Sequence, residues 1–225
     1  MIIFNITFQN LTTLQIYCIV DLHPTKSLLI EMYDHTPITI RDLKITDISS
    51  ALNIAFAELG SDYLTEQDFL DVLDTNGGFC KISITDNIVS GFSICKIFGP
   101  DKIDEMLALP NSDERDALSV HKTIGLLDSV AVAQEMKGKG VGSELISACC
   151  KELAARGADV LCAMAWKDVN GNANISDLLK KTGMSPSIEI RGYWNRFVTS
   201  PDGHDCPICG RPCRCSAVLY MKHIW

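Results

Sequence analysis

The stretch Leu126-Leu-Asp-Ser-Val-Ala-Val-Ala-Gln-Glu-Met-Lys-Gly-Lys-Gly-Val-Gly-Ser143 decides the fold of this chain. Residues 125–132 are mostly apolar, which predicts a buried β-strand. Residues 141–156 carry apolar side chains at helical spacing and precede Gly157, a residue type common just beyond a helix C-terminus. A strand therefore leads through a short glycine-rich loop directly into a helix.

The loop itself has the composition of an anion site. Gly138, Gly140 and Gly142 alternate along it, and glycine lets a ligand approach the backbone without meeting a Cβ atom. The first N–H groups of a helix have no partners, and the helix dipole favours a negative charge there. Lys137 and Lys139 add positive charge. The loop is therefore predicted to hold a pyrophosphate group.

Two better-known phosphate loops do not fit. A dinucleotide fingerprint needs G-x-G-x-x-G, whereas the spacing here is G-x-G-x-G, and the P-loop pattern G-x-x-x-x-G-K-[ST] is absent. A glycine turn without a ligand is the remaining alternative. Such a turn does not require a strand, two lysines and a helix start in this order.

Upstream of the loop, the sequence predicts the order strand, helix, helix, strand, strand. These elements are a strand at 38–43, a helix capped by Thr46, a second helix opened by Thr65–Asp68, and strands at 79–84 and 88–98 joined by a turn at Asp86-Asn87.

Downstream, strands and one short helix are predicted after a long polar connection at 99–122. The predicted elements are a short helix at 103–109 within that connection, a strand at 159–165, a helix at 174–182, and strands at 187–194 and 217–223.

Two motifs resemble the GNAT superfamily of N-acetyltransferases. Lys137-Gly-Lys-Gly140-Val-Gly142 is similar to the family's (Q/R)-x-x-G-x-(G/A) loop, with Lys at the position of the usual Gln or Arg. Asn172-Ala-Asn-Ile-Ser-Asp-Leu-Leu-Lys-Lys-Thr-Gly183-Met184 resembles the next motif, an Asn followed by a helix that ends in Lys-x-Gly-Phe. The resemblance covers about 38–195 and a final strand.

The resemblance implies an α/β fold of the α+β kind. The expected sheet is mixed, mostly antiparallel and six- to seven-stranded, with helices on both faces and a splay at the cofactor cleft between 125–133 and 159–165. One domain is expected at 35–225, including the insertion 99–122 and a cysteine-rich segment at 204–216. Residues 1–34 are expected to form an N-terminal extension, which could contain a pair of strands. Translation could also begin at Met32, which would leave residues 1–31 out of the protein.

The resemblance also implies acetyl-CoA as co-substrate. The backbone of Val130, Ala131 and Val132 would pair with the pantetheine arm, and Asn172 would contact the cofactor or a residue beside it. The loop amides that would hold the pyrophosphate are those of Lys137, Gly138, Lys139, Gly140, Val141, Gly142 and Ser143.

Acetyl transfer requires an uncharged amine, and an alkyl amine with a pKa near about 10.4 is almost wholly protonated at pH 7. Asp128 is the candidate base, since family members often carry an acidic residue at this point of the central strand. The alternative is a carboxylate that caps a loop or pairs with a lysine. A backbone N–H of the splayed strand is expected to stabilise the developing oxyanion.

The family often places a Tyr in its second motif to protonate the departing thiolate, and Leu179 occupies that position here. Tyr220 or Tyr193, on adjacent strands, could substitute for it, although a half-buried strand tyrosine is often only packing. Cys149 and Cys150 lie inside the helix at 141–156, where they are expected to belong to the core.

A second cluster of chemistry lies near the C-terminus, in Cys206-Pro-Ile-Cys209-Gly-Arg-Pro-Cys213-Arg-Cys215. Four cysteines at this spacing predict a structural zinc site, with His204 or His223 as reserve ligands. A disulfide reading fits less well because the loops are short, and because the other six cysteines occupy apolar runs typical of a reduced, cytoplasmic protein.

The net charge of −8 argues against broad nucleic-acid binding. A local positive face is left at Arg191, Arg196, Arg211 and Arg214. This face is either a solvated surface or a docking site for an anionic acceptor or for nucleic acid such as a charged tRNA. No apolar run reaches 18 residues, so no membrane partner is expected. A homodimer is left open.

The function predicted from these features is an acetyl-CoA-dependent N-acetyltransferase in which the amine attacks directly in a ternary complex. The acceptor is left open between a small molecule, a protein amine and aminoacyl-tRNA. Two alternatives remain: a catalytically weak acyl-CoA-binding regulatory module, favoured by Leu179, and a zinc-dependent protein- or RNA-binding adaptor.

Overall fold

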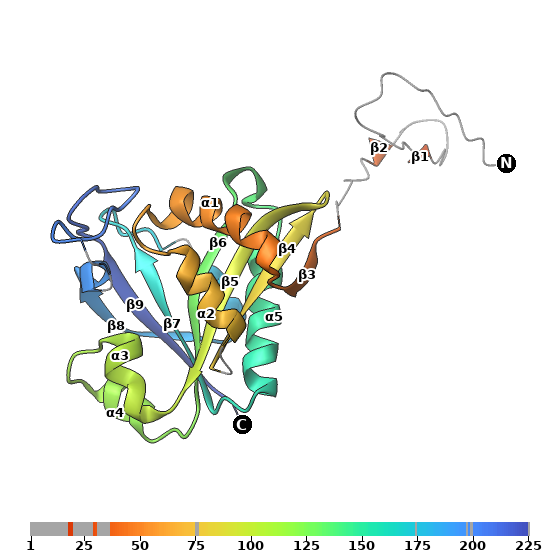
Figure 1. Cartoon of the computed structure of the whole chain (residues 1–225). Coiled ribbons are helices and arrows are strands. Elements are labelled where there is room, and N and C mark those ends of the chain that lie inside the picture. Colours follow the sequence, from red (N-terminus) through yellow and green to blue (C-terminus); the bar gives the residue numbers. More distant parts are fainter. Residues whose placement is uncertain are drawn as a thin grey trace. The chain divides into compact units, whose positions relative to one another are not determined.

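The computed structural model describes residues 37–74, 77–173, 175–196, 198 and 200–224, together with two short strands nearer the N-terminus (Figure 1). The chain divides into two units between Pro37 and Ile38. In the first unit, β1 (Cys18–Ile19) pairs antiparallel with β2 (Leu29–Ile30), so the strand pair that the sequence allowed is present. The rest of the predicted extension lies outside the described residues.

The second unit is built on a seven-stranded sheet (Figure 1). Every neighbouring pair is antiparallel except β6 and β7, which are parallel. This confirms the predicted mixed, mostly antiparallel sheet. The strands in spatial order are β3 (Thr39–Asp42), β4 (Gly78–Thr85), β5 (Ile88–Phe98), β6 (Ile124–Val132), β7 (Val160–Lys167), β9 (Ser216–His223) and β8 (Ser185–Arg191).

The turn between β4 and β5 shows how local chemistry fixes the register of the sheet. Asp86 and Asn87 have φ angles of 51° and 62°, as a two-residue type I′ hairpin requires. Asn and Asp tolerate this conformation better than other residues with side chains, which is why the sequence predicted the turn at this dipeptide.

Helices cover both faces of the sheet (Figure 1). On one face, α1 (Ile48–Leu59) and α2 (Glu66–Asp74) pack on Cys80, Ile82 and other buried strand residues. On the other, α5 (Val141–Ala155) and α6 (Ser176–Lys181) pack in a cluster with Phe79, since successive strand residues point to opposite faces. Among the described residues, no helix is long and apolar enough to cross a membrane.

The insertion at 99–122 contains more helix than the sequence predicted. Besides α3 (Ile103–Leu107), it forms α4 (Asp113–Ser119), where Ser112 caps the first turn by accepting a hydrogen bond from the Arg115 N–H at 3.3 Å. The prediction missed α4 because only Leu118 in it is buried, which leaves no apolar stripe to detect.

The sheet opens between its two parallel strands. β6 pairs with β7 only from Ile124 to Leu127, and the two strands have no further paired positions beyond that point. At the same place, the pairing of β6 with β5 skips Asp128, so this residue forms a β-bulge. The predicted splay is therefore present, and Asp128 lies at the fork.

Candidate active site

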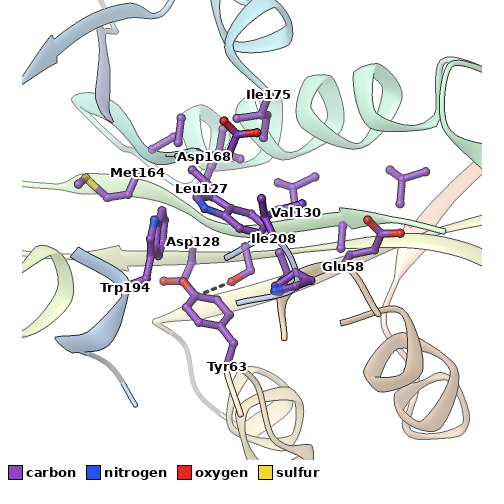
Figure 2. A pocket seen from close by; sticks show the side chains of 18 of the residues that line it. Glu58, Tyr63, Leu127, Asp128, Val130, Met164, Asp168, Ile175, Trp194 and Ile208 are labelled. Carbon is purple, nitrogen blue, oxygen red and sulfur yellow. Dashed lines mark hydrogen bonds between the residues drawn. The ribbon is translucent and has the colours of Figure 1, made fainter. Parts of the chain in front are cut away.

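A cleft of about 390 Å³ occupies the fork between β6 and β7. Its walls are the open ends of these strands, the C-terminal end of α1 with the following loop, α6 with the segment before it, and a loop that includes His204 and Ile208. Figure 2 shows the side chains of Asp128, Tyr63 and Trp194 gathered at the fork.

The glycine loop between β6 and α5 has the open backbone that the sequence predicted. Gly138 and Gly140 have φ angles of 77° and 89°, and a Cβ atom added at either would meet nothing within 4 Å. Their backbone is therefore accessible to a large anion.

The amides that can bind an anion form a narrower set than the predicted 137–143. The N–H groups of Lys137 and Lys139 already donate weakly to the carbonyls of Gln134 and Met136, at 3.3 and 3.4 Å. Within the described part of the chain, the remaining loop amides have no hydrogen-bond acceptor. These are the N–H groups of Gly138, Gly140, Val141, Gly142 and Ser143.

The two lysines of the loop differ in position. Lys137 lines the cleft and its Nζ forms an ion pair with Glu58, a half-exposed contact that an anionic ligand could replace. Lys139 does not line the cleft, and its Nζ lies 3.9 Å from the sulfur of Met136. Lys137 is therefore the lysine better placed to meet a phosphate.

Val130, Ala131 and Val132 form the part of β6 that has lost β7 as a neighbour. All three line the cleft, with Ala131 buried and both valines half-buried. One edge of this strand is open to an extended ligand.

Asn172 lies at the mouth of the cleft beside Asp168. Its backbone N–H and its Nδ2 both donate to the Asp168 carboxylate, at 2.9 and 3.0 Å. The backbone hydrogen bond from Asn172 lowers the pKa of Asp168, which is therefore ionised at neutral pH. Asn172 thus lines the cleft with its side-chain amide already paired.

Asp128 borders the cleft, as a candidate base must, and it also pairs with a lysine, as the alternative interpretation expected. It lines the main cleft and also a neighbouring hollow of about 190 Å³ that includes Lys96 and Glu105. Its Oδ1 lies 3.3 Å from Lys96 Nζ, and its Oδ2 accepts a hydrogen bond from Ser129 Oγ at 3.4 Å. A carboxylate with a lysine partner therefore stands where the two cavities meet.

Neither strand tyrosine suggested as a proton donor lines the main cleft. Tyr220 points to the α5–α6 face, where its hydroxyl pairs with Ser176 Oγ at 2.6 Å. Tyr193 donates to the carbonyl of Leu107 at 2.8 Å and borders only the smaller hollow. Leu179, at the family's Tyr position, is fully buried and lines the cleft.

Tyr63, which was not among the predicted site residues, does line the main cleft. It follows α1, and its ring makes edge contacts with Trp194 and His204, at centroid distances of 5.9 and 5.4 Å. Burial and the nearby charge of Asp128 raise the pKa of Tyr63 well above its ordinary value, so the phenol keeps its proton. The only sequence signal was an aromatic residue in the loop after a helix.

The four C-terminal cysteines come together as predicted. Their sulfur atoms all lie within 4.8 Å of one another. The reserve ligands His204 and His223 do not belong to this group. Cys149 is fully buried and Cys150 half-buried on α5, as expected of core residues.

Comparison with known proteins adds a family match and several similar folds. A family model described as the acetyltransferase (GNAT) family matches residues 45–184. No significant match was found among curated proteins.

Among solved structures, the chain is similar to the ribosomal-protein-S18-alanine N-acetyltransferase of Escherichia coli, with a TM-score of 0.56, 18% identity, and coverage of 84% of this chain and 94% of that one. It is also similar to Arabidopsis thaliana NAA60 in complex with acetyl-CoA (TM-score 0.59, 13% identity, 84% and 99% coverage). A third similar structure is that of Drosophila melanogaster polyamine N-acetyltransferase, with a TM-score of 0.57, 10% identity, and coverage of 84% of this chain and 100% of that one. At these identities the likeness concerns the fold.

Proposed function

This chain belongs to the acetyltransferase (GNAT) family, and we propose that it transfers an acetyl group from acetyl-CoA to a primary amine by direct attack in a ternary complex. The observation that carries the proposal is the fork at Asp128. There a carboxylate, an unpaired strand edge and Lys137 of the glycine loop line one cleft, and the loop leads on to N–H groups at the start of α5 that have no hydrogen-bond acceptor.

Two features of the structure suit coenzyme A. The amides from Gly140 to Ser143 lack acceptors at a helix N-terminus, the environment that a pyrophosphate requires. The open edge of β6 from Val130 to Val132 can pair with the amide groups of the pantetheine arm as a further strand would. When bound, acetyl-CoA supplies the thioester that the amine attacks.

Asp128 is the group that removes the proton of the incoming amine, directly or through one water molecule. An ammonium arriving at the fork would meet the carboxylate that now pairs with Lys96 at 3.3 Å. The ion pair holds the carboxylate in place before the amine arrives.

Tyr63 is the proposed hydrogen-bond donor to the departing sulfur. Because its phenol remains protonated in this environment, it can donate a hydrogen bond but cannot act as a base at neutral pH. A thiol pKa of about 8.5 means that the thiolate leaves with modest assistance, so catalysis tolerates Leu179 at the family's Tyr position.

One specific observation favours a second candidate function. Leu179 is fully buried where the family often carries a proton donor, which would suit a module that binds acyl-CoA and turns it over poorly. The two functions share coenzyme A binding and differ in turnover.

The test uses the purified chain with acetyl-CoA and two acceptors, agmatine and a peptide that begins with alanine. Release of the coenzyme A thiol measures turnover, and calorimetry measures coenzyme A binding. We expect Asp128→Asn to lower kcat by about 100-fold while coenzyme A binds as before. Binding without turnover in the unaltered chain would support the regulatory module, and absence of coenzyme A binding would refute both functions.

A further inference from the structure

The C-terminal cysteine cluster has the dimensions of a tetrahedral metal site. The sulfurs of Cys206 and Cys215 lie 3.8 Å apart, those of Cys209 and Cys215 3.7 Å, and those of Cys209 and Cys213 4.0 Å. Zinc–sulfur bonds of about 2.3 Å in a tetrahedron place the sulfurs about 3.8 Å apart. The same separations are far longer than a disulfide bond of about 2.05 Å.

The backbone around the cluster is folded to support thiolates. The N–H groups of Ile208 and Cys209 both point at Cys206 Sγ at 3.4 Å, and the Arg214 N–H points at Cys209 Sγ at 3.2 Å. Three of the four cysteines are buried, and Cys209 is half-buried. Deprotonated sulfurs crowded in this way require a cation among them.

We propose that Cys206, Cys209, Cys213 and Cys215 bind one zinc ion, and that the loop ordered by this ion forms the acceptor-side wall of the cleft. No open coordination position remains once four sulfurs bind, so the metal is structural. The acceptor role of this wall rests on the proposed function.

Asp62 ties the loop of the cluster to the loop after α1. One carboxylate oxygen accepts the Asp205 N–H at 3.0 Å, and the other accepts Arg211 Nη2 at 2.9 Å. Ser61 Oγ also donates to the Asp205 carboxylate at 3.2 Å. The two loops, 60–63 and 204–211, therefore form one unit, which we call the clasp.

The clasp is a tight contact between two backbones. A Cβ atom added at Gly60 would lie 2.2 Å from the Asp205 carbonyl oxygen and 2.7 Å from His204 Cε1. On the inner side, the Asn195 side chain accepts the N–H groups of both His204 and Cys213, at 2.9 and 3.0 Å. The cluster is thus held between the loop after α1 and the helical turn Tyr193–Arg196 that follows β8.

The clasp presents side chains to the fork. Tyr63 and His204, in ring contact with each other, line the cleft together with Pro207 and the exposed apolar side chain of Ile208 (Figure 2 shows Tyr63 and Ile208 near Asp128). The residues proposed to bind coenzyme A come instead from β6 and the start of α5. Loss of the metal should therefore disturb the clasp, where the amine substrate is proposed to bind, and leave the proposed coenzyme A site on β6 and α5 intact.

The first measurement is metal content. The chain purified under reducing conditions without chelator should contain one equivalent of zinc, and cobalt in its place should give the visible spectrum of a tetrahedral tetrathiolate site. Cys209→Ser should lose the metal, whereas the matched control Cys150→Ser should retain it, because Cys150 lies outside the cluster. A folded chain with no zinc and four free thiols would overturn the proposal.

The second measurement is amide hydrogen exchange before and after zinc removal, which needs no turnover. Exchange at 60–63 should accelerate together with 204–211, while 124–132 stays protected. Acceleration confined to 204–216 would refute the clasp even if zinc is found. If no amine is acetylated but both measurements succeed, the metal site stands and only the proposed function fails.

Ile208→Ala tests the wall without touching a metal ligand. It should retain zinc and bind coenzyme A as before, while the KM for agmatine or the alanyl peptide rises by about tenfold. An unchanged KM for both acceptors would show that this wall does not contact the amine.

Discussion

Replacing Gly60 with alanine probes the contact between the loop after α1 and the loop of the cysteine cluster. Gly60 ends α1 with φ 108° and ψ 153°, a conformation that is essentially restricted to glycine. Its missing Cβ atom would lie 2.2 Å from a backbone oxygen, compared with at least 3.4 Å for an ordinary contact. Gly157 is the matched control, because it follows α5 with φ 88° and an added Cβ there would meet nothing within 4 Å.

The expected magnitude has two parts. Left-handed strain alone should cost Gly157→Ala about 1–2 kcal/mol of unfolding free energy. Gly60→Ala carries similar strain of about 2 kcal/mol and must also move the loops apart by about 1.2 Å, the difference between 2.2 and 3.4 Å. That movement breaks the bond from the Asp205 N–H to Asp62, a hydrogen bond to a charged group worth about 2 kcal/mol. The total is about 4 kcal/mol.

Thermal unfolding followed by circular dichroism checks the difference, with the zinc concentration held constant because a ligand of the folded state shifts Tm. For a domain of this size, about 4 kcal/mol corresponds to a fall in Tm of about 8–16 °C. The Tm of the Gly157→Ala control should fall by a quarter to a half as much. Equal falls in the two variants would refute the reasoning, since they would mean that strain alone acts at Gly60.

Three further predictions concern catalysis, coenzyme binding and pH. Tyr63→Phe keeps the ring contacts but removes the hydroxyl, so kcat should fall by about tenfold in steady-state assays while the coenzyme A Kd is unchanged; an unaltered kcat would exclude the phenol as the hydrogen-bond donor to the departing sulfur. Gly140→Val adds a branched side chain to the loop where the backbone is open, so calorimetry should show a coenzyme A Kd at least about tenfold higher with zinc content intact. Asp47→Asn should lower the unfolding free energy by about 2 kcal/mol at pH 7, because the buried carboxylate accepts two hydrogen bonds from Arg41 at 2.6 and 2.9 Å. The hydrogen bond from Arg41 lowers the pKa of Asp47 in the folded state. The stabilisation is therefore present above the unfolded-state pKa of about 3.9 and is lost as the pH falls through the lower folded-state pKa. A difference in unfolding free energy between the two proteins that stays constant down to about pH 2 would contradict this account.

The sequence predicted the central elements well because their signals are local. The strand expected at 125–132 is β6 (Ile124–Val132), and the helix expected at 141–156 is α5 (Val141–Ala155). The positive φ angles of Gly138 and Gly140 follow from the tight turn that joins β6 to α5. The helix α4 was missed because it has one buried residue and therefore no periodic pattern.

In the candidate site, too, the features contained in a short stretch of sequence were predicted, and those that depend on contacts between distant segments were not. The anion loop and the four cysteines were predicted by spacing, since each is contained in about ten residues. Tyr220 was proposed as a proton donor because it lies on a strand adjacent to the cleft. The alternation of side chains along a strand does not tell which of its two faces borders the cleft. The register of β9 turns this tyrosine toward Ser176 and the α6 face.

By itself, the sequence determined where the backbone turns, where an anion can meet free amides, and which sulfurs lie close enough to share a metal. These depend on conformational preferences and donor types within a few consecutive residues. Only the tertiary structure decided that Tyr63, Asp128 and Ile208 meet at one fork. Their meeting depends on the splay of β6 from β7 and on the clasp, which are packing outcomes between segments far apart in the chain.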